Sequence, residues 1–433
     1  MTLQLARAAG PLIGTVSLPG DKSLAHRAAL FAALAEGVSE IGNYPDSGVT
    51  RAMRGALGSL GVASTLEGGV LRLEGNGFRP FPNDGAVAWC GNSATTIRLL
   101  AGALAGTYSS ATLDGSEGLR RRPMDRIADP LREMGADVTS LGEDGRAPLV
   151  VRPARIEHIC YNLPVASAQV LSCLQIAALG GSSQSRFTVP APVRDHTSRM
   201  LCAMGARIDD SFPCTVVHPL ESPLRPLCGS LPGDISSAAF VFAAAAIVPG
   251  SHVTAVGLGV NPTRTGFLDI LSRMGAGISV SGEREVMGEP VADVTLEYAP
   301  LHGVEVAGDL VVRAIDEIPA LAVVAAFAQG VTVVRDAREL RYKETDRIDA
   351  IVRQFSALGV EVGETPDGFS IRGGTLRGGT AAANGDHRLA MSLALASLRA
   401  DVSVDGAEIL DESFPGFSSV VDSLRSNHQL INP

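Results

Sequence analysis

One short phrase recurs along the chain and limits the folds that it can adopt. The segments LREMGADV, LCAMGARI and LSRMGAGI begin at residues 131, 201 and 271, 70 residues apart. Looser copies, LGSLGVAS and FSALGVEV, begin at residues 57 and 355. Each copy is typical of the last turn of a helix, a glycine that ends it and a short strand. The spacing predicts about six similar units of about 72 residues, the sixth being a degenerate copy, SSVVDSLRSN, that begins at residue 418.

A second phrase groups these units into two halves. LPGDKSLAHRAAL begins at Leu18, and LPGDISSAAFVF begins at Leu231, 213 residues later. Strand and helix patterns alternate in every unit, which predicts an α/β protein of two similar domains with three repeats each. Pro and Gly cluster at both copies, so we expect residues 1–19 and 231–433 to form the first domain and residues 20–230 the second. Two close crossings of the chain between the domains would act as a hinge.

Composition argues against several classes of function. The formal net charge of -10 and the aromatic content of 4% disfavour a nucleic acid or an anionic membrane as the main partner. The longest apolar run, residues 238–248, is too short to span a bilayer, and the N-terminus has no long apolar stretch of a signal peptide. The six cysteines form no C-x-x-C pair, which favours reduced thiols in a cytoplasmic protein.

The sequence also lacks the usual signatures of bound metals and nucleotides. It has no His pair or Cys/His cluster with metal-ligand spacing, and no phosphate-binding loop of the P-loop or dinucleotide type. We therefore expect neither a metal nor a cofactor.

Arginines recur at the predicted starts of helices. One lies 9 to 12 residues before the centre of each repeated phrase; these are Arg51, Arg122, Arg194, Arg264 and Arg347. Eleven residues of helix span about 16 Å, so each Arg should lie near a helix N-terminus. Because helix N-termini disfavour cations, their repeated presence there suggests that bound anions offset the cost. We expect these groups to form an electropositive cleft between the two domains.

The two Leu-Pro-Gly-Asp copies differ in charge. The first has three basic or titratable side chains where the second has apolar ones: Lys22, His26 and Arg27 against Ile235, Ala239 and Phe240. The second copy indicates that the fold does not require these charges. A Ser hydroxyl, a Lys and an Arg at a helix start suit a phosphate and a carboxylate, although they can also form an ordinary cap with a solvated surface.

Seven further polar segments precede or begin apolar helices. They are GNSATTIR at residue 91, RRPM at 121, ASAQV at 166, RDHT at 194, IDEIP at 315, KETDR at 343 and GDHRLAMS at 385. Each one alone is typical of a helix cap, a charge run or surface ion pairs, and acidic residues are expected in a first helical turn.

Together these segments resemble the 5-enolpyruvylshikimate-3-phosphate (EPSP) synthase family of enolpyruvyl transferases, in the family's order, from residue 18 to residue 391. The resemblance implies a two-domain inverted α/β barrel of six βαβαββ repeats, three per domain, with the active site in the cleft between the domains. It implies transfer of the enolpyruvyl group of phosphoenolpyruvate to the 5-hydroxyl of shikimate-3-phosphate. The reaction releases phosphate, proceeds by addition and elimination through a tetrahedral intermediate, and belongs to aromatic amino-acid biosynthesis. A cytoplasmic monomer without a cofactor is expected.

The resemblance also implies a role for each site residue. Shikimate-3-phosphate would be held by Lys22, Ser23, Arg27, Ser167, Ala168, Gln169, Arg194, Asp316 and Lys343. Phosphoenolpyruvate would be held by Lys22, Asn92, Ala94, Arg122, Gln169, Arg347 and Arg388. Asp316 is expected to be the base toward the hydroxyl, and Glu344 and Lys22 are candidates for proton exchange at the methylene. The arginines would stabilise charge on the intermediate and the departing phosphate.

Two positions depart from the family pattern. Many members have Lys-Thr-Phe-Pro near the C-terminus, whereas this chain has Glu412 at the position of the Lys, so that ligand is not assigned. Many members have Gly where this chain has Ala94. The extra methyl group would narrow the phosphoenolpyruvate pocket, which predicts reduced sensitivity to the longer inhibitor glyphosate.

Two alternatives stay open at this point. One is a UDP-N-acetylglucosamine 1-carboxyvinyltransferase, although the loop DGSEGLRRRPM lacks the reactive Cys usual in that family. The other is a non-catalytic protein that binds phosphorylated metabolites. It would need the arginines but neither Asp316 nor Glu344.

Overall fold

The computed structural model divides into two compact units. Unit 1 comprises Met1–Pro19, Gly233–Arg284 and Pro290–Pro433, and unit 2 comprises Gly20–Pro232 and Glu285–Glu289. The structure describes residues 1–374 and 376–425, with all of their side chains except those of Asp411 and Glu412. The boundary after residue 232 lies two residues beyond the expected one. The segment 285–289 was expected in the first domain, but its contacts place it in unit 2.

Unit 2 contains three four-stranded sheets, with the strand orders β14-β3-β5-β4, β6-β7-β9-β8 and β10-β11-β13-β12. Its strands are β3 (Glu36–Gly42), β4 (Ser64–Glu67), β5 (Val70–Asn76), β6 (Ala86–Trp89), β7 (Ala111–Asp114), β8 (Asp137–Ser140), β9 (Leu149–Arg152), β10 (Cys160–Asn162), β11 (Ser185–Thr188), β12 (Ile208–Ser211), β13 (Cys214–Val217) and β14 (Cys228–Ser230). Its helices are α1 (Lys22–Leu34), α2 (Gly48–Ser59), α3 (Ala94–Gly106), α4 (Glu117–Arg120), α5 (Asp125–Glu133), α6 (Ala168–Ala178) and α7 (His196–Ala203), with the short 3₁₀ helix η1 (Glu143–Gly145).

Unit 1 contains the sheets β16-β17-β15-β2, β18-β19-β21-β20 and β1-β23-β22. Its strands are β1 (Thr2–Leu3), β2 (Ile13–Ser17), β15 (His252–Gly259), β16 (Gly277–Val286), β17 (Glu289–Glu297), β18 (Glu305–Val306), β19 (Val331–Val334), β20 (Glu361–Thr365), β21 (Gly368–Arg372), β22 (Gly379–Ala382) and β23 (Val402–Asp405), the turn between β16 and β17 belonging to unit 2. Its helices are α8 (Ile235–Ile247), α9 (Gly266–Met274), α10 (Asp309–Ala314), α11 (Ile318–Phe327), α12 (Arg347–Ala357), α13 (His387–Ala396) and α14 (Phe417–Arg425), with the 3₁₀ helices η2 (Arg338–Tyr342) and η3 (Ala407–Glu412).

All six sheets follow one plan. In each, a central strand pairs with one parallel and one antiparallel neighbour, as β7 does with β6 and β9 and as β23 does with β22 and β1. Where the two parallel strands follow one another in the sequence, the segment between them is helical. For example, α3 connects β6 and β7, and α13 connects β22 and β23. The α/β class and the six repeats, three in each unit, are therefore confirmed.

In each unit, one repeat takes its first strand from a part of the chain that is distant in sequence from the rest of that repeat. Strand β2 precedes α1 in sequence but pairs with β15 in unit 1, whereas β14 precedes α8 but pairs with β3 in unit 2. The two Leu-Pro-Gly-Asp segments are thus the points where the chain passes from one unit to the other. They lie side by side, because the N–H of Asp21 donates to the carbonyl of Pro232, and the N–H of Asp234 donates to that of Pro19, both at 2.9 Å.

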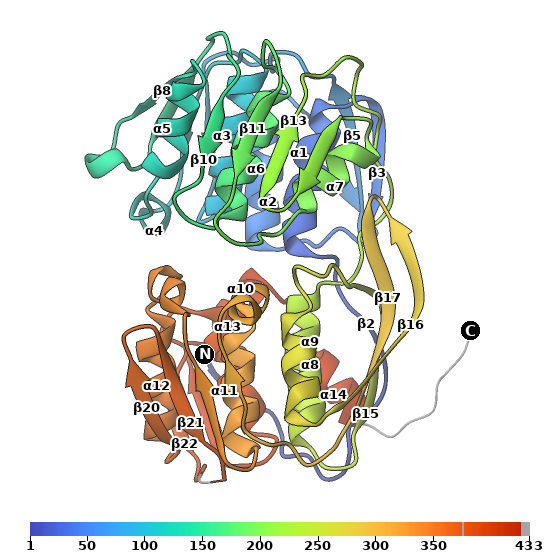
Figure 1. The fold of residues 1–433 in the computed structure, drawn as a ribbon. Coiled ribbons are helices and arrows are strands. Elements are labelled where there is room, and N and C mark those ends of the chain that lie inside the picture. The colour runs from blue at the N-terminus through green and yellow to red at the C-terminus, as the bar shows by residue number, and fades with distance from the viewer. Residues whose placement is uncertain (375, 426–433) are drawn as a thin grey trace. The chain divides into compact units, whose positions relative to one another are not determined.

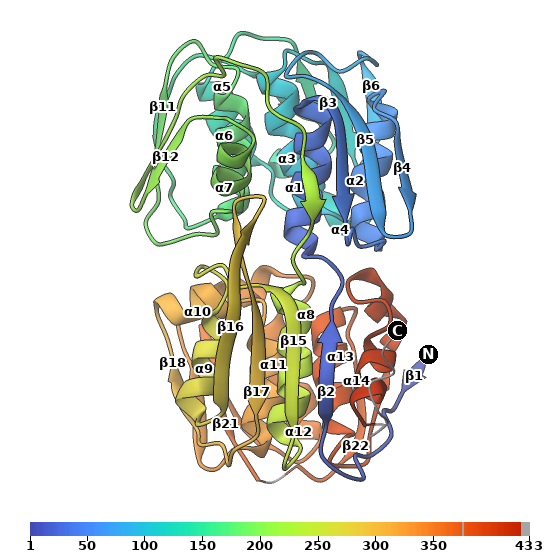
Figure 2. The same cartoon turned by 90° about the vertical axis from the view of Figure 1, so that its right-hand side faces the viewer.

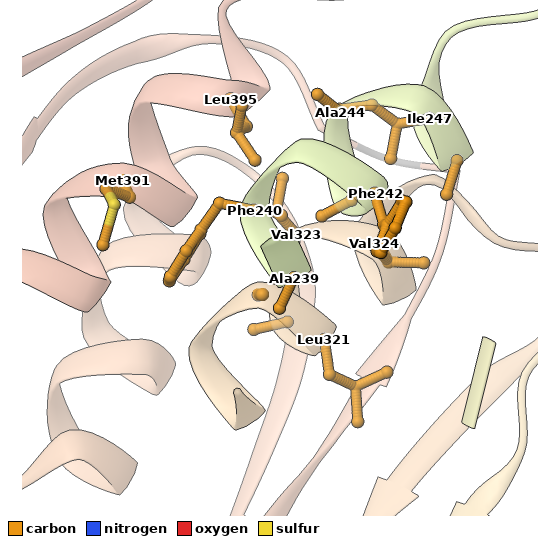
Figure 3. Close-up of a cluster of buried hydrophobic side chains, with 14 of the residues drawn as sticks. Ala239, Phe240, Phe242, Ala244, Ile247, Leu321, Val323, Val324, Met391 and Leu395 are labelled. Atoms are coloured by element: carbon orange, nitrogen blue, oxygen red, sulfur yellow. The ribbon is translucent and has the colours of Figure 1, made fainter. Parts of the chain in front are cut away.

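Three helices in each unit are almost entirely buried, and Figures 1 and 2 show them among the strands. They are α1, α3 and α6 in unit 2 and α8, α11 and α13 in unit 1. Every residue of α8 is buried, as expected for a helix that is apolar on all sides. Figure 3 shows Phe240 of α8, Val323 of α11 and Met391 of α13 in one hydrophobic cluster of unit 1. Among the described residues, no helix is long and apolar enough to cross a membrane.

The repeated Met-Gly and Leu-Gly phrases end the more exposed helices in the predicted way. Their glycines adopt φ values between 86° and 109°, and a strand begins two or three residues later; they are Gly61, Gly135, Gly205, Gly275 and Gly359. The N–H after each glycine donates to the helix carbonyl five positions back at 2.9–3.0 Å, as Ala136 does to Leu131. This is a left-handed C-cap that favours glycine. The degenerate sixth phrase falls on α14, with its last two residues outside the described part of the chain.

Small residues allow the inner helices to approach closely. A Cβ atom added at Gly102 of α3 would lie 2.2 Å from the carbonyl oxygen of Cys173 in α6. One added at Gly106 would lie 3.0 Å from the carbonyl oxygen of Ile176. The abundance of Ala and Gly in the chain thus has a packing role in the core of unit 2.

The substitution Gly102→Ala should destabilise the protein, because its methyl group would collide with the backbone of α6. We expect the free energy of unfolding to fall by about 2 kcal/mol or more, measured by denaturant titration. Gly55→Ala is the matched control, because Gly55 lies in α2 with nothing within 4 Å of an added Cβ. It should leave stability unchanged or raise it by up to about 1 kcal/mol. Equal effects of the two substitutions would contradict this account of the packing.

Candidate active-site residues in the two units

The N-terminal ends of the three inner helices gather within each unit. In unit 2, the His26 Nε2 of α1 is 3.2 Å from the hydroxyl of Ser93, the N-cap of α3, and Gln169 of α6 donates to Thr95 of α3 at 2.9 Å. In unit 1, Glu317 before α11 contacts side chains from the first turns of α8 and α13. Helix N-termini carry partial positive charge and exposed N–H groups, so each gathering favours anions.

All fifteen predicted site residues lie in the first two turns of a helix or within four residues before one. Unit 2 holds Lys22, Ser23, Arg27, Asn92, Ala94, Arg122, Ser167, Ala168, Gln169 and Arg194, and unit 1 holds Asp316, Lys343, Glu344, Arg347 and Arg388. The five arginines singled out by their spacing also lie at helix starts, as predicted. Glu412 ends η3, and its side chain lies outside the described residues.

Arg27 is a buried guanidinium in unit 2. Its Nε donates to the hydroxyl of Thr197 at 2.8 Å, and its Nη2 donates to that of Ser172 at 2.9 Å. Its Nη1 donates to the carbonyl of Ser23 at 3.0 Å. Arg27 therefore links α1 to α6 and α7, and these bonds fix the orientation of its guanidinium.

Arg98, for which the sequence indicated no role, is the last residue of the segment GNSATTIR, and its bonds organise the same region. It donates to the side-chain oxygen of Gln169, and its Nη2 donates to the carbonyl of Pro123 at 3.2 Å. Pro123 directly follows Arg122. Arg98 thereby links the start of α6 to the segment that carries Arg122, which only the tertiary structure could reveal.

His26 serves the fold rather than a ligand. It is 2% exposed, with Nδ1 2.7 Å from the carbonyl of Lys22 and Nε2 3.2 Å from the hydroxyl of Ser93. The pattern fits a neutral ring that donates from Nδ1 and accepts at Nε2. Burial lowers the pKa of His26 to about 4. Among Lys22, His26 and Arg27, the residues that distinguish the first Leu-Pro-Gly-Asp copy, His26 connects α1 to the N-cap of α3.

Arg347 is the central cation of unit 1. It is 1% exposed, and its Nε donates to Asp386 at 2.6 Å while its Nη2 donates to Glu344 at 2.7 Å. Its Nη1 lies 3.7 Å from Asp316 Oδ1, beyond hydrogen-bond distance. Burial alone lowers the pKa of Arg347, but the three carboxylates outweigh it and raise that pKa above its ordinary value. The guanidinium is therefore permanently charged and rigidly held.

Asp386 is a member of this cluster that the sequence reasoning missed. It is fully buried, and its Oδ1 caps α13 by accepting from the N–H of Arg388 at 2.9 Å, while its Oδ2 binds Arg347. Burial raises the pKa of Asp386, but Arg347 and His387 together outweigh it and hold that pKa below its ordinary value. An Asp before an apolar helix predicts a cap, whereas its second bond, to a residue 39 positions away, has no local signal.

The structure brings all five predicted residues of unit 1 together. Lys343 Nζ lies 3.5 Å from Asp316 Oδ1, and Arg388 Nη1 donates to the carbonyl of Asp316 at 2.8 Å. With Arg347 and Glu344 they form one cluster around Asp316. In unit 1 the cations are interleaved with carboxylates, whereas in unit 2 Arg27 and Arg98 have hydroxyl, amide and carbonyl partners.

Comparison with known proteins identifies the family. The EPSP synthase (3-phosphoshikimate 1-carboxyvinyltransferase) family model matches residues 6–421. The 3-phosphoshikimate 1-carboxyvinyltransferase of Herpetosiphon aurantiacus is 46% identical over 411 residues, which cover 94% of this chain and 95% of that protein. That of Geobacter sulfurreducens is 44% identical over 417 residues, which cover 95% and 97%.

Solved structures show the same fold. The EPSP synthase of Acinetobacter baumannii matches with a TM-score of 0.89 at 35% identity, over 98% of both chains. The enolpyruvyl transferase NikO of Streptomyces tendae matches with a TM-score of 0.78 at 19% identity, over 98% of this chain and 97% of that one. At that identity NikO supports the fold alone. The predicted inverted α/β architecture of enolpyruvyl transferases is confirmed.

Protonation of His26 should destabilise the protein in acid. The unfolded ring binds a proton near pH 6.5 and the folded ring only near pH 4, so stability contributed by the neutral ring is present above pH 6.5 and is lost as the pH falls toward 4. Between pH 7.5 and pH 5 this loss amounts to about 2 kcal/mol. The variant His26→Gln should lose less stability over that interval than the parent, measured by denaturant titration at both pH values. An identical pH dependence in the two proteins would contradict the prediction.

Proposed function

The chain belongs to the EPSP synthase family, and we propose that the residues at the helix N-termini of its two units carry the family's reaction. The protein is an enzyme that transfers the enolpyruvyl group of phosphoenolpyruvate to the 5-hydroxyl of shikimate-3-phosphate and releases phosphate. This reaction belongs to the shikimate pathway of aromatic amino-acid biosynthesis. All the assigned residues come from one chain, so we also propose a monomer, acting in the cytoplasm.

The binding role of unit 2 rests on its charge and its helix ends. Lys22, Arg27 and Arg194 are assigned to the phosphate and hydroxyl groups of shikimate-3-phosphate, together with Ser23, Ser167, Ala168 and Gln169. Support comes from their location at helix starts, where the partial positive charge of the helix end adds to that of the basic side chains. Arg122, Asn92 and Ala94 are assigned to phosphoenolpyruvate. Arg98 helps to position ligands of both substrates, because it donates to Gln169 and to the carbonyl of Pro123, the residue after Arg122.

The catalytic role of unit 1 rests on the cluster around Asp316, the observation that carries the proposal. In the reaction the phosphoenolpyruvate methylene gains a proton, C2 becomes electrophilic and the substrate hydroxyl attacks it while losing its proton. Asp316 is assigned as the base that receives this proton. Lys343 at 3.5 Å and Arg347 at 3.7 Å favour its charged form, which a base requires.

The later steps need proton removal and stabilisation of negative charge. Loss of a proton from the methyl group of the tetrahedral intermediate re-forms the double bond as phosphate departs, and Glu344 and Lys22 are assigned to this proton exchange. Arg347 and Arg388 are assigned to phosphoenolpyruvate and to the charge on the departing phosphate. The assigned ligands of each substrate come from both units.

A phosphate-release assay tests this function. The protein is mixed with phosphoenolpyruvate and shikimate-3-phosphate, and in parallel with phosphoenolpyruvate and UDP-N-acetylglucosamine. We expect release only with shikimate-3-phosphate. Release with the nucleotide sugar would favour the sibling transferase, and binding without release in either mixture would favour a non-catalytic binding protein.

The variant Asp316→Asn should lose about 10²–10⁴-fold in kcat, because the amide cannot accept the hydroxyl proton. Shikimate-3-phosphate binding, measured by calorimetry, should persist within about tenfold, since only one of its assigned contacts changes. Asp269→Asn is the matched control: Asp269 pairs with Arg313 at 2.6 Å in the same unit and has no assigned role. A kcat within twofold of the parent for Asp316→Asn would remove Asp316 from the mechanism.

The variant Ala94→Gly should bind glyphosate more tightly than the parent does. Ala94 is the first residue of α3, at the helix start assigned to phosphoenolpyruvate, and its methyl group would narrow the pocket there. We expect the inhibition constant of glyphosate to fall at least tenfold while KM for phosphoenolpyruvate changes by less than about threefold, as one methyl group in a pocket discriminates by about 10–200-fold. An inhibition constant no tighter than that of the parent would show that this methyl group does not limit inhibitor binding.

A further inference from the structure

We propose that Glu317 is a positioning residue that holds Arg388 in place for phosphoenolpyruvate. The proposal rests on the role assigned to Arg388 under the proposed function and extends it to a side chain that touches neither substrate. Glu317 follows the proposed base Asp316 directly, yet its side chain is fully buried whereas that of Asp316 is 17% exposed. Two neighbouring carboxylates thus occupy different environments.

The side chain of Glu317 does not do what its position in the sequence predicts. Glu317 is the N-cap of α11, where an acidic residue ordinarily accepts a hydrogen bond from the helix backbone. Its carboxylate makes no such bond to the first turn of α11. Its interactions are instead with side chains from two other inner helices.

The first interaction is with α8. The hydroxyl of Ser236 donates to Glu317 Oε1 and accepts from Arg264 Nη2 at 2.8 Å. Arg264 is 2% exposed and also lies 3.5 Å from Asp234, the N-cap of α8. Ser236 can use its single proton only toward Glu317, so this chain of bonds fixes the orientation of the carboxylate.

The second interaction is with α13. Arg388 Nη1 lies 3.6 Å from Glu317 Oε1 and donates to the carbonyl of Asp316 at 2.8 Å. The side chain of Arg388 is 8% exposed, so a small part of it remains accessible to a ligand. A buried carboxylate requires a partner cation, and here that cation is a group assigned to the substrate. Glu317 therefore sets where the guanidinium of Arg388 lies before phosphoenolpyruvate arrives.

The variant Glu317→Gln tests the proposal, since it keeps the size of the side chain and removes its charge. KM for phosphoenolpyruvate should rise about 10–100-fold, the usual effect of losing the residue that orients a ligand-binding group. KM for shikimate-3-phosphate should stay within about twofold, a split that a general loss of structure would not produce. Ser236→Ala, which removes the bond that orients Glu317, should raise KM for phosphoenolpyruvate in the same direction by a smaller factor. Asp269→Asn again serves as the control, with both KM values unchanged.

A double-mutant cycle with Arg388→Gln distinguishes a failure of this proposal from a failure of the proposed function on which it rests. If Glu317 acts through Arg388, the double variant should bind phosphoenolpyruvate no more weakly than Arg388→Gln alone. Two results would overturn the positioning role alone. One is a double variant in which the KM increases of the two single variants multiply. The other is a normal KM for phosphoenolpyruvate in Glu317→Gln when Arg388→Gln is impaired. A normal KM in Arg388→Gln would overturn the assigned role of Arg388 and this inference with it. If Glu317→Gln does not fold, as judged by thermal unfolding, Ser236→Ala decides: an unchanged KM in that variant would overturn the proposal.

Discussion

The structure depends on the enclosure of helices that are apolar on every side. Helices such as α8 and α11 have no polar face to turn toward water, so sheets surround them and the polar positions of the helices are confined to their ends. The N-terminal ends present partial positive charge and N–H groups that the helix itself does not use. The location of most candidate site residues follows from this constraint, because they lie where the inner helices begin. The others lie at the starts of α5, α7 and α12; they are Arg122, Arg194, Lys343, Glu344 and Arg347.

The two Leu-Pro-Gly-Asp copies show that equivalent positions in the two units can hold side chains with different roles. Ser23 and Ser236 occupy the same place in the two Leu-Pro-Gly-Asp copies, as do Arg27 and Phe240. Phe240 packs in the core of unit 1, whereas Arg27 is buried against the hydroxyls of Thr197 and Ser172. The backbone tolerates either residue. The proposed ligand binding would account for Lys22 and Arg27, whereas a bond between helices accounts for His26.

The repeats allowed much of the fold to be predicted from the sequence, because a left-handed helix end strongly favours glycine and so leaves a periodic mark. The position of Arg194 or Arg264 at a helix start followed from the same period. The interactions of side chains did not follow, since their partners lie far apart in the chain. Glu317 meets Ser236 across 81 residues, and no local pattern distinguishes its orientation from that of a helix cap. The assignment of the turn 285–289 to unit 2 is likewise a matter of tertiary contacts.

The arrangement around Arg347 bears on the proposed role of Glu344 in proton exchange. Glu344 accepts a hydrogen bond from Arg347 at 2.7 Å, and a proton taken up by its carboxylate would weaken that ion pair. Asp386 holds the same guanidinium through Nε, so Arg347 would keep its place while Glu344 changed its charge. A lysine could not do this, because a single ammonium lacks the planar fork that binds two carboxylates in fixed directions. The buried Asp386 thus makes it physically possible for Glu344 to exchange a proton beside a cation that does not move.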